Sequence, residues 1–226
     1  MELDILRVKS GAEYDPIFKN IKAPLLKPPF LLVINGSVKT GKSTILMNLI
    51  YNKNFYKDMF DTVIFISPTV ENDVTLKHLN EDEDILKLNP NDNLDESVKT
   101  IVDEKMDDED EKLKNYLIVL DDCLGYIKPN SYFVYLCTRY RQRKISLIIT
   151  SQSFRNIPNV IRVNATGYLL FKTLNNKELY KYIEEFSGLF KDFKKIYEEA
   201  TKEPYNFLYL NLRNIEAYKN FSVKLD

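Results

Sequence analysis

The chain has 226 residues, of which 44% are hydrophobic, so it can form the core of one domain of ordinary size without disulfide bonds or a structural metal. Two cysteines and a single histidine, His78, are too few for a disulfide framework or a Cys/His zinc site. No apolar run reaches the ~18 residues of a membrane span. We therefore expect a soluble intracellular protein that does not contact membranes. The net charge of −1 does not exclude a nucleic-acid partner, because residues 71–114 contain 16 of the 33 acidic but only 6 of the 32 basic residues, which leaves the rest of the chain basic.

The amino-terminal part of the chain leads into a strand and a helix. Residues 1–29 contain scattered apolar side chains and three prolines near their end, so we expect an extended lead-in. The continuous apolar run at 30–35 is typical of a buried strand, and the apolar periodicity at 45–50 favours a helix. A second apolar run predicts a buried strand at 62–67, which a proline ends.

An acidic insert follows at about residues 71–114. It contains a weak helical pattern of apolar residues between Leu94 and Val102. The acidic run at 103–112 has two interpretations that the sequence leaves open. It is either a solvated surface loop or helix end, or a segment that repels DNA and leaves the basic surface elsewhere to bind it.

The second half of the chain alternates between strand and helix patterns. The predicted elements are strands at 116–122, 146–152, 167–173 and 206–212, the last of them a final edge strand, and helices at 131–143 and 179–200, the second broken near Gly188. Continuous apolar strands separated by helices are typical of a mainly parallel sheet with helices on both faces. We therefore predict one α/β domain at residues 30–226, preceded by the lead-in at 1–29.

The loop after the first strand has a phosphate-binding sequence, because Gly36 to Ser43 match the pattern G-x-x-x-x-G-K-[ST]. The glycines allow a tight loop whose backbone N–H groups converge on phosphate oxygens, and the following helix directs its positive dipole end at the anion. Lys42 places a positive charge between the β- and γ-phosphates of ATP, and Ser43 offers a hydroxyl to Mg²⁺. The predicted nucleotide-binding residues are Gly36, Ser37, Val38, Lys39, Thr40, Gly41, Lys42, Ser43 and Thr44.

Two adjacent carboxylates, Asp121 and Asp122, end the predicted strand at 116–122. A P-loop needs a carboxylate at the tip of a neighbouring strand to hold the metal, and a strand buried on both faces rarely ends in two charges without a function. We assign Asp121 to Mg²⁺ through a coordinated water, and Asp122 to the attacking water, either as its base or as the group that orients it. Gln152 ends the next predicted strand and would place an amide beside the γ-phosphate.

Three further segments distinguish kinds of P-loop protein: TRYRQR at 138–143, the Ser151–Gln152 pair, and IPNVIRVN at 157–164. Together with the proline-containing lead-in and the aspartate pair, they resemble the genome-packaging ATPases of poxviruses, other large nucleocytoplasmic DNA viruses and virophages, which belong to the FtsK–HerA superfamily of P-loop NTPases. The resemblance covers about residues 24–215 and implies a three-layer, RecA/FtsK-like fold. The chain departs from the common family pattern at Tyr140 and Gln142, where many relatives have glycine and histidine.

The resemblance implies a homo-oligomeric ring, usually a hexamer, that hydrolyses ATP and pulls double-stranded DNA into a preformed capsid. The expected partners are therefore DNA, further copies of the chain and viral capsid proteins, at the virus assembly site in the host cytoplasm or in the virion. In such rings an arginine of a neighbouring protomer completes the nucleotide site, where it neutralises transition-state charge. Arg141 matches the family pattern best, and Arg139, Arg155 and Arg162 are alternatives.

Three other functions remain open. A P-loop kinase that phosphorylates a nucleoside or another small acceptor usually has an arginine-rich lid, but the segment after 146–152 has one arginine in IPNVIRVNA. An AAA-type remodelling ATPase has a carboxy-terminal helical bundle, whereas this chain predicts a strand at 206–212. A nucleotide-regulated switch hydrolyses slowly, and the aspartate pair with Gln152 favours hydrolysis.

Overall fold

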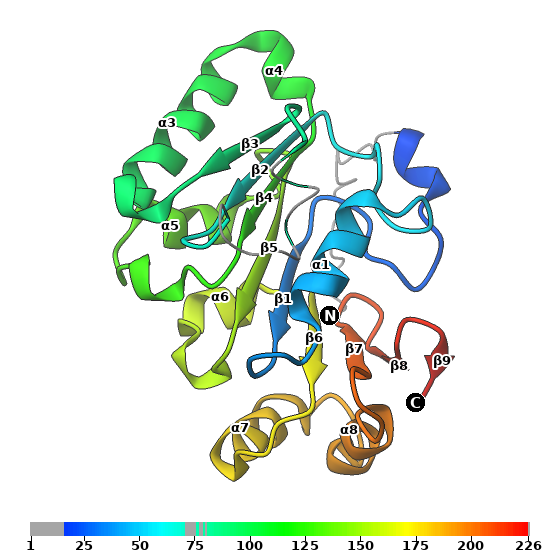
Figure 1. Cartoon of the computed structure of the whole chain (residues 1–226). Helices are drawn as coiled ribbons and strands as arrows, with labels where there is room; N and C mark the ends of the chain where they lie inside the picture. The colour runs from blue at the N-terminus through cyan, green and yellow to red at the C-terminus, as the bar shows by residue number, and fades with distance from the viewer. Residues whose placement is uncertain (1–15, 71–75, 77–78, 80, 226) are drawn as a thin grey trace, which may run out of the picture.

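The computed structural model describes residues 16–70, 76, 79 and 81–225, so the first fifteen residues, part of the acidic insert and His78 lie outside the described part. Within it the chain forms one nine-stranded sheet (Figure 1). The strands are β1 (Leu31–Asn35), β2 (Thr62–Ile66), β3 (Ile85–Leu88), β4 (Tyr116–Leu120), β5 (Ile145–Ser151), β6 (Gly167–Phe171), β7 (Phe207–Asn211), β8 (Glu216–Lys219) and β9 (Val223–Lys224).

The sheet is mainly parallel, as the sequence predicts. Its strand order is β3-β2-β4-β5-β1-β6-β7-β8-β9, and the strands from β3 to β6 are parallel, whereas β7 to β9 are added antiparallel to β6 and to one another. The central strand β1 pairs with β5 on one side and with β6 on the other. The carboxyl ends of the parallel strands therefore share one edge of the sheet, which is where α/β proteins form their ligand sites.

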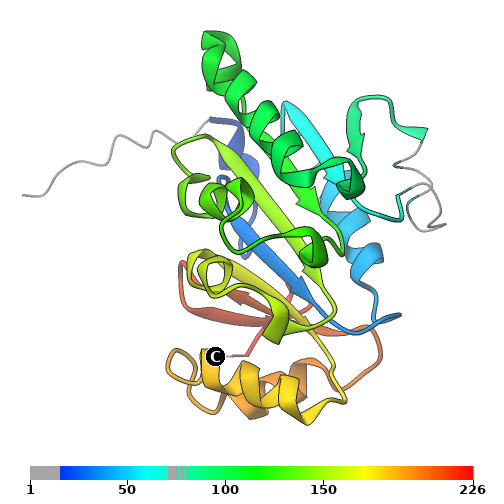
Figure 2. The ribbon, with the colours of Figure 1, turned by 90° about the vertical axis from the view of Figure 1, so that its left-hand side faces the viewer.

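Helices cover both faces of the sheet, so the fold has three layers (Figures 1 and 2). The helices are α1 (Lys42–Tyr51), α3 (Leu94–Asp107), α4 (Glu109–Leu113), α5 (Tyr132–Arg139), α6 (Asn159–Asn164), α7 (Asn176–Phe186) and α8 (Phe193–Ala200). Buried residues of α1 pack on one face, and buried residues of α3 and α5 to α8 pack on the other. None of the described helices is long and apolar enough to cross a membrane.

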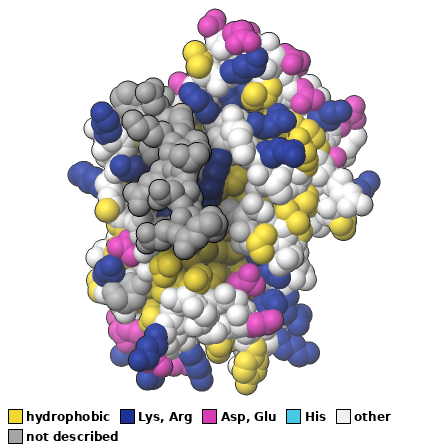
Figure 3. Space-filling model, turned by 180° about the vertical axis from the view of Figure 1, so that it is seen from behind, with side chains coloured by type: hydrophobic (Ala, Val, Ile, Leu, Met, Phe, Trp, Pro, Cys, Tyr) yellow, Lys and Arg dark blue, Asp and Glu magenta, His cyan; other side chains and the backbone are white. Residues whose placement is uncertain are grey.

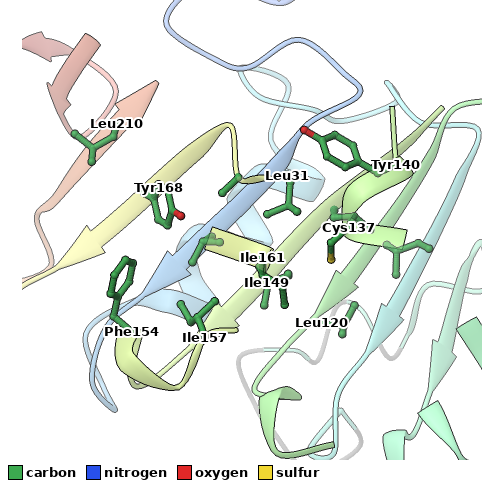
Figure 4. Packing of buried hydrophobic residues seen from close by; sticks show 14 of the residues in the cluster. Leu31, Leu120, Cys137, Tyr140, Ile149, Phe154, Ile157, Ile161, Tyr168 and Leu210 are labelled. Atoms are coloured by element: carbon green, nitrogen blue, oxygen red, sulfur yellow. The ribbon is translucent and has the colours of Figure 1, made fainter. Parts of the chain in front are cut away.

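The strands supply both cores because their side chains alternate between the two faces. In β1, Leu31 and Val33 belong to the cluster under α3 and α5 to α8, whereas Leu32 and Ile34 belong to the cluster under α1. Figure 4 shows part of the first cluster, with Ile149 of β5 beside residues of α5 and α6. Each such side chain contributes about 1.5–3 kcal/mol when it is fully buried, so the long apolar runs become the inner strands of the sheet.

Four expectations about individual elements need correction. The lead-in is not extended throughout, because Pro16–Asn20 form a 3-10 helix. The helix predicted at 131–143 ends at Arg139. The acidic insert contains the four-residue strand β3, which is too short to stand out among its charged neighbours. Strand β7 is not at the edge of the sheet, since β8 and β9 follow it; β8 has the sequence EAYK, which lacks an apolar run.

Other expectations are confirmed. The long helical pattern at 179–200 is interrupted between α7 and α8, around the predicted break at Gly188. Residues 107–110 of the acidic run are exposed at the junction of α3 and α4, which agrees with the solvated interpretation. Acidic side chains accordingly gather at the top of the molecule in Figure 3, the position of α4 in Figure 1. The role of this acidic surface toward DNA stays a prediction.

A buried lysine holds the acidic arm of α3 and α4 against the sheet. Lys105, on α3, is 1% exposed and donates hydrogen bonds to the backbone oxygens of Glu111 and Lys114. Its ammonium group lies 4.5 Å from the centre of the Tyr116 ring at the start of β4. Burial lowers the pKa of Lys105 to about 8, since desolvation disfavours its charged form.

Candidate functional site

The loop from Gly36 to Gly41 connects β1 to α1 at the carboxyl edge of the sheet. Gly41 caps the helix with a φ of 105°, a conformation that glycine adopts without strain. A Cβ atom on Gly36 would lie 2.6 Å from Thr40 Oγ1 and 2.7 Å from Phe171 Cβ, so no larger residue fits there without movement. The two fixed glycines of the motif are therefore required for different reasons, one for backbone angle and the other for space.

The side chain of Lys42 extends toward the start of this loop. Its Nζ donates hydrogen bonds to the backbone oxygens of Gly36 at 2.8 Å and Ser37 at 3.0 Å, and the side chain is buried. Burial lowers the pKa of Lys42, and the negative charges of Asp122 and Asp121 partly oppose that shift. The structure therefore brings the lysine of the P-loop into the electrostatic field of the aspartate pair.

The aspartate pair is fixed by a threonine that the sequence analysis did not single out. Thr150 Oγ1, on β5, donates to Asp121 Oδ1 at 2.7 Å and accepts from the backbone N–H of Asp122 at 2.9 Å. The backbone N–H of Asp121 also donates to Ile66 at the end of β2, at 2.9 Å. Asp121 is buried, whereas Asp122 is half-buried and has a φ of 51°, so the two carboxylates differ in their access to solvent.

The structure brings the side chains of Gln152 and Asp122 into contact. Gln152 Nε2 donates to Asp122 Oδ2 at 2.8 Å, which joins the tips of β4 and β5. Both side chains line a small cavity of about 200 Å³, together with Thr150. The amide is exposed and the carboxylate is half-buried, so solvent can reach the pair.

Helix α7 contacts the segments that carry the site through two buried polar side chains. Glu178 accepts hydrogen bonds from Ser153 Oγ and from the backbone N–H of Phe154, both at 2.8 Å, directly after Gln152. One turn further along α7, Tyr182 donates to Asn35 Oδ1, and Asn35 Nδ2 donates to the backbone oxygen of Ser151 at 3.0 Å. The helix therefore holds the ends of both β1 and β5.

The sequence analysis missed these supporting residues, although weak signals for them exist. Asn35 and Thr150 are polar residues within apolar strand runs. Glu178 and Tyr182 lie on the same face of α7 as Phe186, at the i, i+4, i+8 spacing of a buried stripe. A carboxylate in such a stripe indicates a buried partner.

The remaining loop residues are more accessible. Ser43 is half-buried in the first turn of α1, and Thr44 beside it is exposed. Ser37, Val38 and Lys39 form the exposed tip of the loop, and Thr40 Oγ1 donates to the backbone oxygen of Ser37 at 2.8 Å.

The four candidate arginines occupy different places. Arg141 lies between α5 and β5, hence at the amino edge of the parallel strands, where its Nε donates to Tyr140 Oη at 3.1 Å. Arg139 stacks on Tyr135 at the same edge. Arg162 is paired with Glu185, whereas Arg155 lies at the carboxyl edge, where its Nε is 3.2 Å from Glu178 Oε1. The structure does not bring Arg141 to the P-loop of its own chain.

Comparisons with known proteins identify the family of the chain and proteins of the same fold. Residues 18–192 match the family model described as Poxvirus A32 protein. No curated protein sequence matches the chain significantly.

Solved structures show the same fold at low sequence identity. The genome packaging NTPase B204 from Sulfolobus turreted icosahedral virus 2, in complex with AMP, superposes with a TM-score of 0.65 at 16% identity, over 86% of this chain and 98% of that one. The DNA-packaging ATPase B204 from Sulfolobus turreted icosahedral virus gives a TM-score of 0.62 at 17% identity, over 85% and 97%. The pCW3 conjugation coupling protein TcpA gives 0.56 at 15% identity, over 80% and 57%.

Proposed function

The chain belongs to the poxvirus A32 protein family, and from that premise we propose that it is an ATPase that moves double-stranded DNA into a viral capsid. One observation carries the proposal: a buried P-loop lysine lies in the field of an aspartate pair, and one of those aspartates is hydrogen-bonded to a glutamine on the next strand. This arrangement combines a phosphate cradle, a metal-binding carboxylate and a polar pair that can position water.

Nucleotide and metal binding follow from the donor atoms. The loop residues 36–44 hold the phosphates, and Lys42 exchanges its two backbone contacts for phosphate oxygens. The hydroxyl of Ser43 and the carboxylate of Asp121 are the hard oxygen ligands that Mg²⁺ prefers, and Mg²⁺ sites of this kind take their other ligands from phosphate and water. No group of three or more acidic, histidine or cysteine side chains in the described residues offers an alternative cage. The metal supplies positive charge at the β- and γ-phosphate oxygens.

We assign the hydrolytic step to Asp122 and Gln152. The amide of Gln152 occupies Asp122 Oδ2, which leaves the other carboxylate oxygen to accept a hydrogen bond from a water aligned with the γ-phosphate. Because the Gln152 amide connects the ends of β4 and β5, its position can depend on whether the γ-phosphate is present.

The position of Arg141 is compatible with a role in the site of a neighbouring copy of the chain. Arg141 lies at the amino edge of the sheet, whereas the P-loop lies at the carboxyl edge. Arg141 of one protomer can therefore complete the nucleotide site of a neighbour whose carboxyl edge faces it. We therefore propose a homo-oligomeric ring, a hexamer as the family resemblance implies, with DNA and viral capsid proteins as partners at the site of virus assembly in the host cytoplasm. The proposed ATPase domain spans residues 30–226.

The alternative functions gain no support from the described residues. Between β5 and β6 the chain forms a 3-10 helix and the six-residue α6, which is too short for the lid of a small-molecule kinase. After α8 the chain returns to the sheet as β7 to β9, where an AAA-type remodelling ATPase has a helical bundle.

A steady-state ATPase assay with and without duplex DNA tests the proposal. We expect the Lys42→Ala variant to lose activity while it stays folded, because the hydrogen bonds of the lysine go to backbone oxygens of the P-loop. DNA should stimulate the wild-type protein, and the stimulation should fall steeply with salt, since phosphate contacts release counterions. Lys53→Ala, at an exposed lysine after α1, serves as the control. Undiminished activity in folded Lys42→Ala would contradict the proposal.

A further inference from the structure

A cavity of about 790 Å³ lies beside the P-loop, on the side away from the aspartate pair. The loop residues 37–40 form one wall of the cavity. The other wall contains Leu174 from the segment after β6, and Lys202 and Tyr205 from the segment before β7. The volume falls within the range of about 300–1,000 Å³ that is usual for small-molecule sites.

The cavity combines exposed apolar side chains with positive charge. Leu174 is 92% and Tyr205 is 72% exposed, although both are large hydrophobic residues. The Tyr205 ring lies against the P-loop itself, since a Cβ built on Gly41 is 3.6 Å from Tyr205 Cδ1. Lys172 and Lys202 line the same cavity. An aromatic face next to lysines suits a base and ribose that are attached to phosphate.

Two neighbouring cavities are less suitable for the base and ribose of a nucleotide. The cavity on the other side of α1, of about 720 Å³, shares only Thr44 with the P-loop and presents Glu81 and Asp82, which repel phosphate. The cavity beside Asp122 and Gln152 holds only about 200 Å³, which is below the usual range for a nucleoside-sized ligand. Of these three cavities, which are lined by described residues, the one beside Tyr205 therefore suits best the nucleoside of a ligand whose phosphates are held by Lys42.

We propose that this cavity binds the nucleoside of the nucleotide, with the base stacked on Tyr205. The inference rests on the proposed function, because it takes the P-loop as the phosphate site. Tyr205 has a φ of 64°, in the left-handed region that most side chains avoid. The ring is thus kept against the P-loop at a conformational cost, which is typical of residues at binding sites.

The test compares two ligands by calorimetry in the presence of Mg²⁺: the ATP analogue AMPPCP and inorganic tripolyphosphate, which lacks base and ribose. Loss of one stacking interaction is worth about 1–3 kcal/mol, so we expect Tyr205→Ala to weaken AMPPCP binding by roughly 5- to 150-fold. The affinity for tripolyphosphate should not change. Tyr205→Phe should bind AMPPCP as the wild type does, because it keeps the aromatic face.

Two controls separate stacking from other effects. Tyr180→Ala removes a tyrosine on α7 that is equally exposed, at 72%, but lies outside the cavity, and it should change neither affinity. Tyr205→Asn removes the ring and keeps a residue that tolerates the left-handed backbone, so it should behave as Tyr205→Ala does.

The outcomes distinguish this inference from the function on which it depends. If Tyr205→Ala and Tyr205→Asn leave AMPPCP binding unchanged, or weaken both ligands equally, the nucleoside does not lie on Tyr205. If Lys42→Ala binds both ligands as tightly as the wild type, the P-loop assignment itself is wrong. An altered sedimentation coefficient of Tyr205→Ala with unchanged AMPPCP affinity would instead assign this surface to contact with a second copy of the chain and overturn the inference.

Discussion

At the scale of single residues, Thr150 orients the aspartate pair through two hydrogen bonds. Its hydroxyl bridges the side chain of Asp121 and the backbone of Asp122, so the buried carboxylate is oriented while the next one turns toward solvent. One strand tip thereby presents two identical side chains in different environments, which allows them different roles.

This difference predicts distinct defects for conservative variants. Asp121→Asn should weaken the dependence of nucleotide binding on Mg²⁺, because a neutral amide is a poorer ligand for a hard cation. Asp122→Asn and Gln152→Ala should bind Mg²⁺ and AMPPCP normally and lose turnover. Nucleotide titrations at several Mg²⁺ concentrations, combined with ATPase rates, measure both properties. Identical Mg²⁺ dependence in the two aspartate variants would show that the roles are not divided in this way.

A second residue-scale prediction concerns Lys105. Because its pKa of about 8 in the folded chain lies below the usual 10.5 of the unfolded chain, the unfolded state binds more protons between these pH values. The free energy of unfolding should therefore rise as the pH increases through this window, by at most about 2 kcal/mol between pH 7 and 9.5. The neutral amine still has two N–H groups for its two carbonyl partners, so its hydrogen bonds persist.

Urea denaturation followed by circular dichroism at several pH values measures this rise. Lys105→Met should lower stability at every pH, because it leaves the two carbonyls unpaired, but its stability should increase less with pH than that of the wild type. Lys99→Met, at an exposed position of the same helix, should keep the wild-type slope. Parallel slopes for wild type and Lys105→Met would rule out the assigned pKa.

At the scale of elements, helix α7 connects the two strand ends that form the site. Glu178 fixes the chain immediately after Gln152, and Tyr182 fixes Asn35 immediately before Gly36. We therefore consider Glu178 a positioning residue, which acts on hydrolysis through Gln152 without reaching the nucleotide.

We predict that Glu178→Gln lowers kcat roughly 10- to 100-fold, since small displacements of an orienting group cost this much. The KM for ATP and the affinity for AMPPCP should stay unchanged, because the contacts of the P-loop itself are not altered. Glu184→Gln, an exposed glutamate on the same helix, is the matched control. A parallel loss of AMPPCP affinity would mean that Glu178 supports the P-loop as a whole and does not act through Gln152.

The sequence predicts some elements better than others for physical reasons. The strands β1, β4, β5 and β6 are buried on both faces, so their apolar runs are continuous, and the P-loop motif is local. Strands β3 and β8 are short and partly exposed, so they leave no such pattern. The contacts of Glu178 join residues 23, 24 and 25 positions apart, and those of Thr150 join residues 28 and 29 positions apart. These contacts depend on how elements dock, which local periodicity does not encode.

At the scale of the whole molecule, the two edges of the sheet carry different parts of the proposed machinery. The P-loop, the aspartate pair and Gln152 lie at the carboxyl edge, and Arg139 and Arg141 lie at the amino edge. A ring in which each protomer presents one edge to the next would join the two sets at every interface.

Mixing of inactive variants tests this arrangement. An arginine in trans is worth about 10³ to 10⁵ in rate in other P-loop proteins, so Arg141→Ala alone should be nearly inactive. Combined with Lys42→Ala protomers it should regain activity, because some interfaces then pair an intact P-loop with an intact arginine. A mixture of Lys42→Ala with Asp122→Asn provides the matched control and should gain little, since both residues serve one site within the same chain.

Mixed oligomers that form without any gain in activity would exclude Arg141 as the residue in trans. Arg155 would then be the first alternative, because it lies at the carboxyl edge and is oriented by Glu178. Arg139 and Arg162 can be tested by the same mixtures.

The position of β1 in the sheet also has a consequence for the synthesis of the protein. Its neighbours β5 and β6 begin at Ile145 and Gly167, more than a hundred residues later in the chain. A ribosome that adds about 5–20 residues per second therefore completes the P-loop sequence several seconds before either partner strand emerges. During that interval the apolar run LLVIN has unpaired backbone groups on both sides, so the phosphate-binding strand is a segment of the nascent chain that chaperones would need to protect.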